Sequence, residues 1–212
     1  MIEGLIAKGK GFLLEPSASF RKSREDSVGA AYRYFVVLLI LYTILSAVIA
    51  VAAGMYAFNE MIVQLGQAGM VGEVLSGALA HMGSFVAAMI LFAVYLFFLI
   101  ALFGIFIKGL ALHIFVLLFG GKKGPEQTLK TAMYATTPFF LLGWIPYVSI
   151  IGVIWYLVLM VIGIREMQEI EMGKALLVVV VPMVLILIMV ILGGIVIAGL
   201  IQGFLNMIPL LG

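Results

Sequence analysis

The residues of this chain that could carry out chemistry are few, and the first candidates form a glycine-lysine motif near the N-terminus. Gly4, Gly9 and Lys10 have the spacing that opens a phosphate-binding loop, in which the residue after the lysine is Ser or Thr and holds magnesium. That residue is Gly11 here. Because the hydroxyl is missing and no predicted strand precedes the motif, we interpret the segment as a flexible, amphipathic N-terminus.

The other candidate groups are one histidine and two isolated carboxylates. His113 could relay a proton or bind a ligand, but no carboxylate is near it in sequence, so a single hydrogen bond is the simpler interpretation. Glu60 and Glu73 could hold a cation weakly, and solvated side chains are the simpler interpretation. The chain has no cysteine, which excludes a thiolate nucleophile and a cysteine-ligated metal. We therefore expect no catalytic residue, cofactor or metal, and no enzyme activity.

The composition indicates the environment of these residues. Hydrophobic residues make up 65% of the chain and charged residues 10%, whereas a soluble domain is about half apolar and about one quarter charged. So few charges cannot cover a water-facing surface, and most of this surface must face lipid. The net charge of +2 is too small to suggest a nucleic-acid partner.

Four segments are long and apolar enough to cross a bilayer, which takes about 20 residues. None contains an Asp, Glu, Lys or Arg, and they are Tyr34–Ala57, Ser84–Ile107, Val148–Ile164 and Ala175–Ile201. A fifth and shorter segment, Leu129–Ile145, follows a marked helix start at Gly124 and Pro125. The first long apolar run begins only near Tyr34, so we expect that helix to act as its own uncleaved insertion signal.

The basic residues predict the orientation of these spans. Eleven lie before the first span, between the second and third, or between the fourth and fifth, and Lys130, at the start of the third, is expected to extend to the membrane interface on the same side. Five crossings with a cytoplasmic N-terminus put every one of them in the cytoplasm, as the positive-inside rule requires. We therefore predict an all-α fold, a polytopic membrane bundle of five transmembrane helices (N-in/C-out) with amphipathic interfacial helices.

This prediction divides the chain into three parts. Residues 1–33 are a cytoplasmic amphipathic segment, residues 34–201 are the five-span domain, and residues 202–212 are a short external tail. Within the domain, residues 58–83 have apolar side chains at helical spacing that glycines interrupt, which predicts two short helices on the outer surface. The apolar stretch 109–121 is too short to span, and it either extends the second helix, lies in the interface or dips in and out.

The shortest span contains a proline near its middle. Pro138 removes one backbone hydrogen bond and should kink the helix. Because no water is available in lipid, the freed carbonyl needs another donor, and the hydroxyls of Thr136 and Thr137 are close. We expect this kink to shape packing with neighbouring helices, with a functional interface or small cavity nearby; the alternative is a tolerated proline.

Small residues recur at a spacing of four, which lets helix backbones approach closely. They are Ser46, Ala50 and Gly54 in the first span, and Gly194, Ala198, Gly199 and Gly203 in or just after the last. Packing within one chain is the simpler interpretation, and a homo-oligomer or a contact with another membrane protein is the alternative.

Several short motifs, taken in order, carry a resemblance to a known family. They are Pro16 and Phe20, then His113-Ile114-Phe115 leading to Gly120-Gly121, Gln127-Thr128, Tyr134-Ala135-Thr136-Thr137-Pro138, Ile154-Trp155, Gly163, Lys174-Ala175 and Pro182. With these residues the chain resembles the Yip1 domain family, and it is most similar to the short prokaryotic members. The resemblance implies five spans, a cytoplasmic N-terminus and a place in the cell membrane.

The same resemblance bears on partners and function. Eukaryotic members act in vesicle traffic and associate with Rab-type GTPases. They typically carry a long cytoplasmic N-terminal region, which is short here, so a small GTPase partner is in doubt. We expect a non-enzymatic integral membrane protein that organises the bilayer or scaffolds partner proteins. The alternative is a small-solute transporter or channel component. The candidate structural or interaction residues are Tyr134, Thr136, Thr137, Pro138, Trp155, His113, Gly120 and Gly121.

Overall fold

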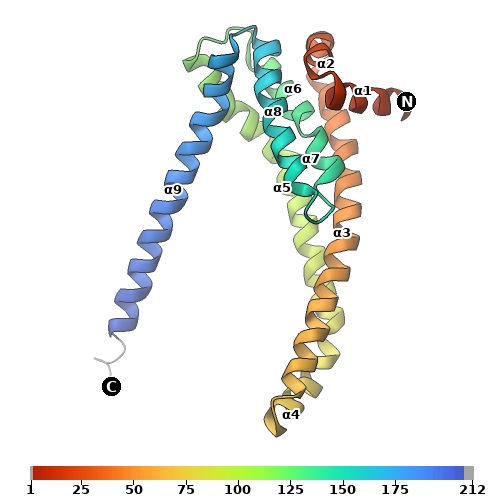
Figure 1. Ribbon diagram of the computed structural model, residues 1–212, viewed down its shortest axis with the longest axis vertical. Helices are drawn as coiled ribbons and strands as arrows, with labels where there is room; N and C mark the ends of the chain where they lie inside the picture. The colour runs from red at the N-terminus through yellow and green to blue at the C-terminus, as the bar shows by residue number, and fades with distance from the viewer. Residues whose placement is uncertain (1, 208–212) are drawn as a thin grey trace.

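The computed structural model describes residues 2–207, and every regular element in that range is helical. Two helices, α3 and α5, run side by side as a long pair, and α9 diverges from them (Figure 1). Between α5 and α9 the chain forms a hairpin of α6, α7 and α8. The N-terminal α1 and α2 lie near the end of the pair where α3 begins (Figure 1). The bounds are α1 Ile2–Leu14, α2 Pro16–Lys22, α3 Val28–Gly66, α4 Met70–Leu79, α5 Gly83–Leu118, α6 Pro125–Ala135, α7 Thr137–Leu142, α8 Ser149–Gln168 and α9 Met172–Met207.

In the described chain, four helical stretches are long and apolar enough to cross a membrane. They are Val28–Gly66, Met70–Leu118, Ser149–Gln168 and Met172–Gln202. Three of them contain one of the segments that the sequence predicts as clear spans, and Ser149–Gln168 contains the fourth except for Val148. The protein is thus an all-helical, multi-pass membrane-type protein.

The α3–α5 pair is longer than the spans predicted within it. The Ser27 hydroxyl caps α3 by accepting a hydrogen bond of 3.1 Å from the backbone N–H of Ala30. The helix then continues through Gly66, so residues 58–66 are part of α3, and the two short helices predicted for 58–83 are reduced to α4 and a 3₁₀ turn at Ala80–Met82. Gly54 allows close approach to α5, since a Cβ there would lie 2.3 Å from Ile90 Cδ1. Packing within the chain accounts for Gly54.

The stretch 109–121 extends the second predicted span as a helix as far as Leu118, which is the first of its three alternatives. Helix α5 runs without interruption through Leu118, and it buries Gly109, Leu112, His113 and Val116. A Cβ at Gly109 would lie 2.6 Å from Leu129 Cδ2, so the extension packs tightly on α6. Because such contact needs a residue without a side chain, glycine at this position draws α5 and α6 together.

The shortest predicted span, 129–145, is two helices rather than one kinked helix. Helix α6 ends at Ala135, Thr136 separates the two, and α7 begins at Thr137 with Pro138 in its first turn. This helix position suits proline, whose missing N–H has no partner to lose there. The segment is therefore absent from the continuous helices long enough to span.

The turn of the hairpin lies part-way along the α3–α5 pair. The Tyr42 ring of α3 lies 5.3 Å from the Phe139 ring of α7 and 5.9 Å from the Phe97 ring of α5. Both long helices extend well beyond this level (Figure 1). Tyr147, at the turn, has a φ of 66° and is 90% exposed.

Helix α9 packs on the rest of the molecule only near its start. Ala175, Val178 and Val179 are buried, whereas the residues after Pro182 are exposed. A Cβ at Gly194 or Gly199 would meet nothing within 4 Å, so the small residues of this helix have no packing partner within the described chain. The helix continues through Met207, where the sequence predicts a tail from residue 202. The surroundings of Gly203, and residues 208–212 of that tail, lie outside the described residues.

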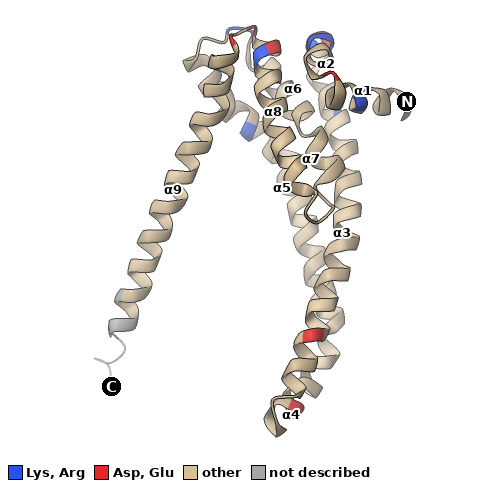
Figure 2. Cartoon of the chain, in the orientation of Figure 1, with Lys and Arg blue, Asp and Glu red and all other residues tan. Residues whose placement is uncertain are grey.

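Charge and core share one end of the molecule. Lys and Arg residues gather where α1, α2 and the α8–α9 connection lie (Figure 2). The charged residues on the far part of α3 and on α4 are all acidic (Figure 2). The largest fully buried side chains are at the basic end too, among them Tyr134, Phe12, Phe20 and Phe35. The part of the molecule with the most tertiary structure is therefore the basic end.

Candidate functional site

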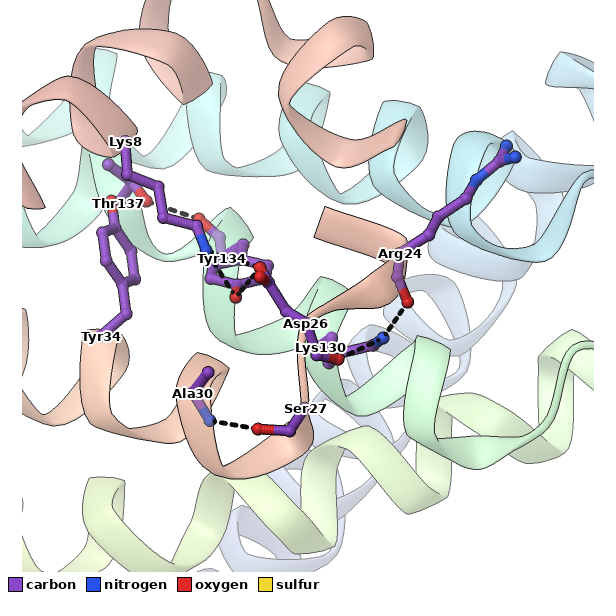
Figure 3. Close-up of polar contacts among 9 residues, drawn as sticks. All are labelled: Lys8, Arg24, Asp26, Ser27, Ala30, Tyr34, Lys130, Tyr134 and Thr137. Carbon is purple, nitrogen blue, oxygen red and sulfur yellow. Dashed lines mark hydrogen bonds and ion pairs between the residues drawn. The ribbon is translucent and has the colours of Figure 1, made fainter. Parts of the chain in front are cut away.

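A polar cluster ties the N-terminal helices to the hairpin (Figure 3). Lys8 of α1 makes an ion pair of 2.6 Å with Asp26, which lies just before α3. The Tyr134 hydroxyl of α6 joins both partners, because it donates to Asp26 Oδ2 at 2.6 Å and accepts from Lys8 Nζ at 2.9 Å. The three groups form a closed triangle from three segments that are distant in sequence.

Lys130 of α6 completes the cluster from within the protein. Its side chain is 2% exposed, and its ammonium donates to the carbonyl oxygens of Arg24 at 2.6 Å and Asp26 at 2.9 Å. The sequence suggests a lysine that extends to the membrane interface, and this expectation is wrong. Carbonyl oxygens replace water as acceptors, which a buried cation requires.

A chain of hydroxyl groups runs from α3 into the helix break. Pro138 has no N–H to donate to the carbonyl oxygen of Tyr134, and the Thr137 hydroxyl donates to that oxygen instead, at 2.6 Å. Since the single proton of Thr137 is used there, Thr137 must accept at 3.0 Å from the Tyr34 hydroxyl. The Thr136 hydroxyl likewise donates to the Met133 carbonyl at 2.6 Å. Both threonines thus satisfy backbone carbonyls at the break.

Aromatic rings form the apolar side of the cluster. Phe12 of α1 is fully buried, and its ring lies 4.8 Å from the Tyr134 ring and 4.9 Å from the Phe20 ring. The Lys8 ammonium lies 4.4 Å from the centre of the Tyr134 ring, within the range of a cation–π contact. Helix α1 is therefore held to the hairpin by a buried ring as well as by an ion pair.

The protonation of Asp26 depends on this arrangement. Burial raises the pKa of its carboxyl, but hydrogen bonds from Lys8 and Tyr134 and the charge of Lys8 lower it by more. The pKa of Asp26 therefore lies below its ordinary value. The carboxylate is ionised throughout the physiological pH range, and the ion pair with Lys8 persists there.

A second polar cluster joins the ends of α5, α6 and α8. His113 Nδ1 lies 2.9 Å from the Thr128 hydroxyl, which also accepts at 3.0 Å from the Gln168 amide nitrogen. Gln168 reaches the connection before α6 through the Gly124 carbonyl at 2.9 Å. His113 thus takes part in a structural network, and the single hydrogen bond expected for it is made with Thr128.

The glycine pair after α5 supports this second cluster. Gly120 has a φ of 91°, a conformation that side chains rarely adopt, and it turns the chain out of the helix. A Cβ at Gly121 would lie 2.3 Å from Val116 Cγ1 and 3.1 Å from Gln168 Oε1. Both glycines of the motif therefore have a local structural role.

The acidic residues near the end of α8 hold the N-terminal segment as well. Glu166 is 7% exposed and lies 3.5 Å from Arg21 and 3.8 Å from Arg24. Glu169 pairs with Arg24 at 2.8 Å and with Lys123 at 2.5 Å, and the hydrogen bond from Lys123 lowers its pKa. Both glutamates lie near Arg165 and Lys174 in the sequence, a pattern that predicts a solvated turn, whereas the structure has long-range ion pairs.

Of the residues that the sequence singles out, His113 and the glycine pair lie at the second cluster, and a separate group lies at the helix break. Tyr134, Thr136, Thr137 and Pro138 are buried side by side at the break between α6 and α7. Trp155 of α8 is half-buried against the core and belongs to neither polar cluster.

Sequence reasoning missed Lys8, Asp26 and Lys130. One signal was available, because Asp26 is the only aspartate in the chain, and it directly precedes the Ser27 cap. Nothing local to Lys8 or Lys130 indicates that their side chains meet.

The geometry suits holding segments together more than covalent chemistry. Among the described residues, no group of three His, Cys, Asp or Glu side chains is placed to hold a metal ion. In the first cluster, each titratable group faces an opposite charge or a hydrogen-bond partner. What the cluster does is fix α1 and α2 on the membrane hairpin.

Comparison with known proteins agrees with this membrane architecture. The Yip1 domain matches residues 10–208, which is nearly the whole chain and includes the second polar cluster and all of the first except Lys8. No curated protein and no solved structure gives a significant match. The match also runs through the Tyr134–Pro138 motif and the glycine pair, and the chain belongs to the Yip1 domain family.

Proposed function

We propose that this protein is a non-enzymatic scaffold of the cell membrane, which presents α1 and α2 to cytoplasmic or membrane partners from a fixed position. The observation that carries the proposal is the attachment of α1 by Lys8, Asp26 and Tyr134 together with the buried Phe12 ring. An amphipathic helix that only touched lipid would need none of these contacts. The outer side of α1 remains free for a partner, with Ile6 54% and Leu14 78% exposed.

The proposed orientation is N-in/C-out. It is supported by the twelve basic residues, which the positive-inside rule assigns to the cytoplasm, and by the acidic far end of α3 and α4. Single cysteines at Lys123 and Gly69 test it in this cysteine-free chain. We expect a membrane-impermeant maleimide to label the Gly69 position from outside and the Lys123 position only after the membrane is opened, and the reverse pattern would refute the orientation.

The five predicted crossings fit this orientation in a modified form. The third and fourth, which are α6–α7 and α8, enter from the cytoplasmic end. Phe139, shortly before their turn, packs on Tyr42, which also contacts Phe97 part-way along the α3–α5 pair. We propose a re-entrant hairpin beside three full crossings by α3, α5 and α9. Five crossings and this arrangement give the same sides for both ends of the chain.

The transporter alternative requires a polar path between the helices. The clefts described between the spanning helices argue against it, because one is lined mainly by Ile40, Ile44 and Leu91 and the others are also mainly apolar. Proteoliposomes separate the two functions. We expect permeability to protons, potassium ions and small dyes to equal that of empty vesicles, and a protein-dependent flux would favour the transporter.

Attachment of α1 should matter for the scaffold. Asp26→Asn weakens it while leaving the exposed residues of α1 unchanged. We expect proteins that cross-link to a photoreactive residue at Leu14 in native membranes to be lost in this variant, with Glu73→Gln as the matched control at the opposite end. Unchanged cross-linking in Asp26→Asn would refute a role for the fixed position of α1.

A further inference from the structure

One lysine at the level of the membrane has no carboxylate partner. Lys108 of α5 donates a hydrogen bond to the Tyr156 hydroxyl of α8, and its ammonium lies 4.5 Å from the centre of the Tyr156 ring. Over residues 2–207, no Asp or Glu is within ion-pair distance of it. By contrast, Arg24 and Lys123 at the cytoplasmic end both pair with glutamates. A cation near the hydrocarbon without a counter-charge is costly, so an external anion would stabilise it.

An apolar cleft opens on one side of this Lys108–Tyr156 pair. It has a volume of about 720 Å³ and lies between α5, α8 and the diverging α9. The wall formed by α9 extends from Val179 to Met189, which is about 15 Å at 1.5 Å per residue. This length matches one leaflet of a hydrocarbon core about 30 Å thick. The cleft therefore has the length and lining of a site for one acyl chain.

A second apolar cleft lies on the other side of the same pair. It has a volume of about 420 Å³ and is lined by α3, α5, α7 and α8, including Phe35, Ile100 and Phe139. The two clefts share Gly104, Lys108 and Tyr156. One polar pair is thus flanked by two apolar clefts, as the headgroup of a diacyl lipid is attached to two chains.

We propose that Lys108 and Tyr156 bind the headgroup of one anionic glycerophospholipid, whose acyl chains occupy the two clefts. Lys108 supplies the positive charge that distinguishes an anionic lipid from a zwitterionic one, and the Tyr156 hydroxyl donates a hydrogen bond to a phosphate oxygen. The clefts place the chains in the cytoplasmic leaflet. The inference goes beyond the scaffold proposal, because it concerns lipid recognition and requires no protein partner.

The test compares two lipids that differ only in headgroup. Native mass spectrometry of the purified protein would count phosphatidylglycerol and phosphatidylcholine molecules retained with identical acyl chains. We expect one tightly held phosphatidylglycerol, about tenfold weaker in Lys108→Gln, because a charge-assisted hydrogen bond is lost. Lys108→Arg should retain the lipid, and Lys122→Gln, which removes an exposed lysine elsewhere, should leave binding unchanged.

A second measurement locates the lipid if a lysine variant folds poorly. Phosphatidylglycerol with a photoreactive acyl chain should cross-link to peptides around Met160 and Met183 in the wild-type protein, and Met183→Trp should fill the cleft and reduce that cross-linking. Equal retention of the two lipids would overturn the proposal. Cross-links spread evenly over the lipid-facing surface, or equal retention by Lys108→Gln and Lys122→Gln, would overturn it as well.

Discussion

At the scale of single residues, the first polar cluster contains two lysines, Lys8 and Lys130, and one carboxylate, Asp26, so its net charge is positive. The Lys8 ammonium pairs with the Asp26 carboxylate, whereas the Lys130 ammonium donates hydrogen bonds to two backbone carbonyl oxygens. Each ammonium is satisfied, but through different acceptors. Removal of one acceptor would leave a partly buried cation without a partner, which costs more than the hydrogen bond itself contributes. These residues are therefore sensitive to substitution.

Tyr134→Phe should destabilise the protein measurably. The substitution keeps the ring that packs on Phe12 but removes the hydroxyl bound to Lys8 and Asp26. Hydrogen bonds to charged groups contribute about 1.5–3 kcal/mol each. We expect a loss of about 2 kcal/mol in the free energy of unfolding, followed by thermal unfolding in detergent. Tyr147→Phe is the matched control, because Tyr147 is 90% exposed, and equal effects of the two would contradict the role of the hydroxyl.

The cluster should also make stability depend on pH. The pKa of Asp26 in the folded protein lies below the ordinary 3.8. A lowered carboxyl pKa contributes stability at pH values above 3.8, and that contribution is lost as the pH falls through the folded value. The difference in unfolding free energy between the wild-type protein and Asp26→Asn should thus be largest near pH 7 and shrink below about pH 4. A constant difference from pH 7 to pH 3 would show that the charge of Asp26 is irrelevant.

At the scale of elements, the break between α6 and α7 depends on a proline and the threonine before it. Pro138 leaves the Tyr134 carbonyl without its helical donor, and Thr137 supplies a hydroxyl from within the same turn. The same hydroxyl accepts from Tyr34, which ties α3 to the break. The break is therefore a joint between two helices and not only an interruption of one.

A double-mutant cycle tests this joint. Thr137→Val removes the hydroxyl with little change in shape, and it leaves the buried Tyr134 carbonyl and the Tyr34 hydroxyl without partners, at a cost of about 1–3 kcal/mol each. Pro138→Ala restores an N–H that can donate to the same carbonyl. We expect Thr137→Val to cost at least about 1 kcal/mol less in the Pro138→Ala background. Thr136→Val should cost the same in both backgrounds, and equal costs for Thr137→Val would leave that residue with a packing role only.

The elements also differ in how far the sequence predicts them. Hydropathy predicts α3, α5, α8 and α9, because each is one continuous apolar segment of the sequence. The proline at position 138 also directs attention to Thr136 and Thr137, because it leaves a backbone carbonyl without its hydrogen-bond donor. Hydropathy does not predict the pairing of Lys8 with Asp26, or of Arg24 with Glu166, because those pairs join segments that only tertiary folding brings together. Nor does it find the depth of the hairpin, which depends on how α7 packs against Tyr42.

At the scale of the whole molecule, tertiary contacts and basic charge are concentrated at one end. Three helices extend from this end as apolar rods, and α9 separates from the others past Pro182 (Figure 1). Since lipid tails are as apolar as the side chains on these rods, little drives the rods together. The helices pack closely at the basic end, where polar networks and connecting loops also hold them together. The molecule is best described as a compact basic end with long apolar helices that extend from it.

This view predicts that the tip of the hairpin lies inside the bilayer. From Tyr42, which packs on Phe139 shortly before the tip, α3 continues to Glu60, a rise of about 27 Å at 1.5 Å per residue. That distance nearly equals the whole hydrocarbon thickness of about 30 Å, so a tip at the outer surface would carry the rest of α3 far beyond the membrane. A spin label on a cysteine at Tyr147 should therefore collide readily with oxygen and poorly with a water-soluble nickel complex. Cysteines at Tyr95 and Gly69 provide the membrane and water references, and a Tyr147 label that behaves like the one at Gly69 would establish a full crossing.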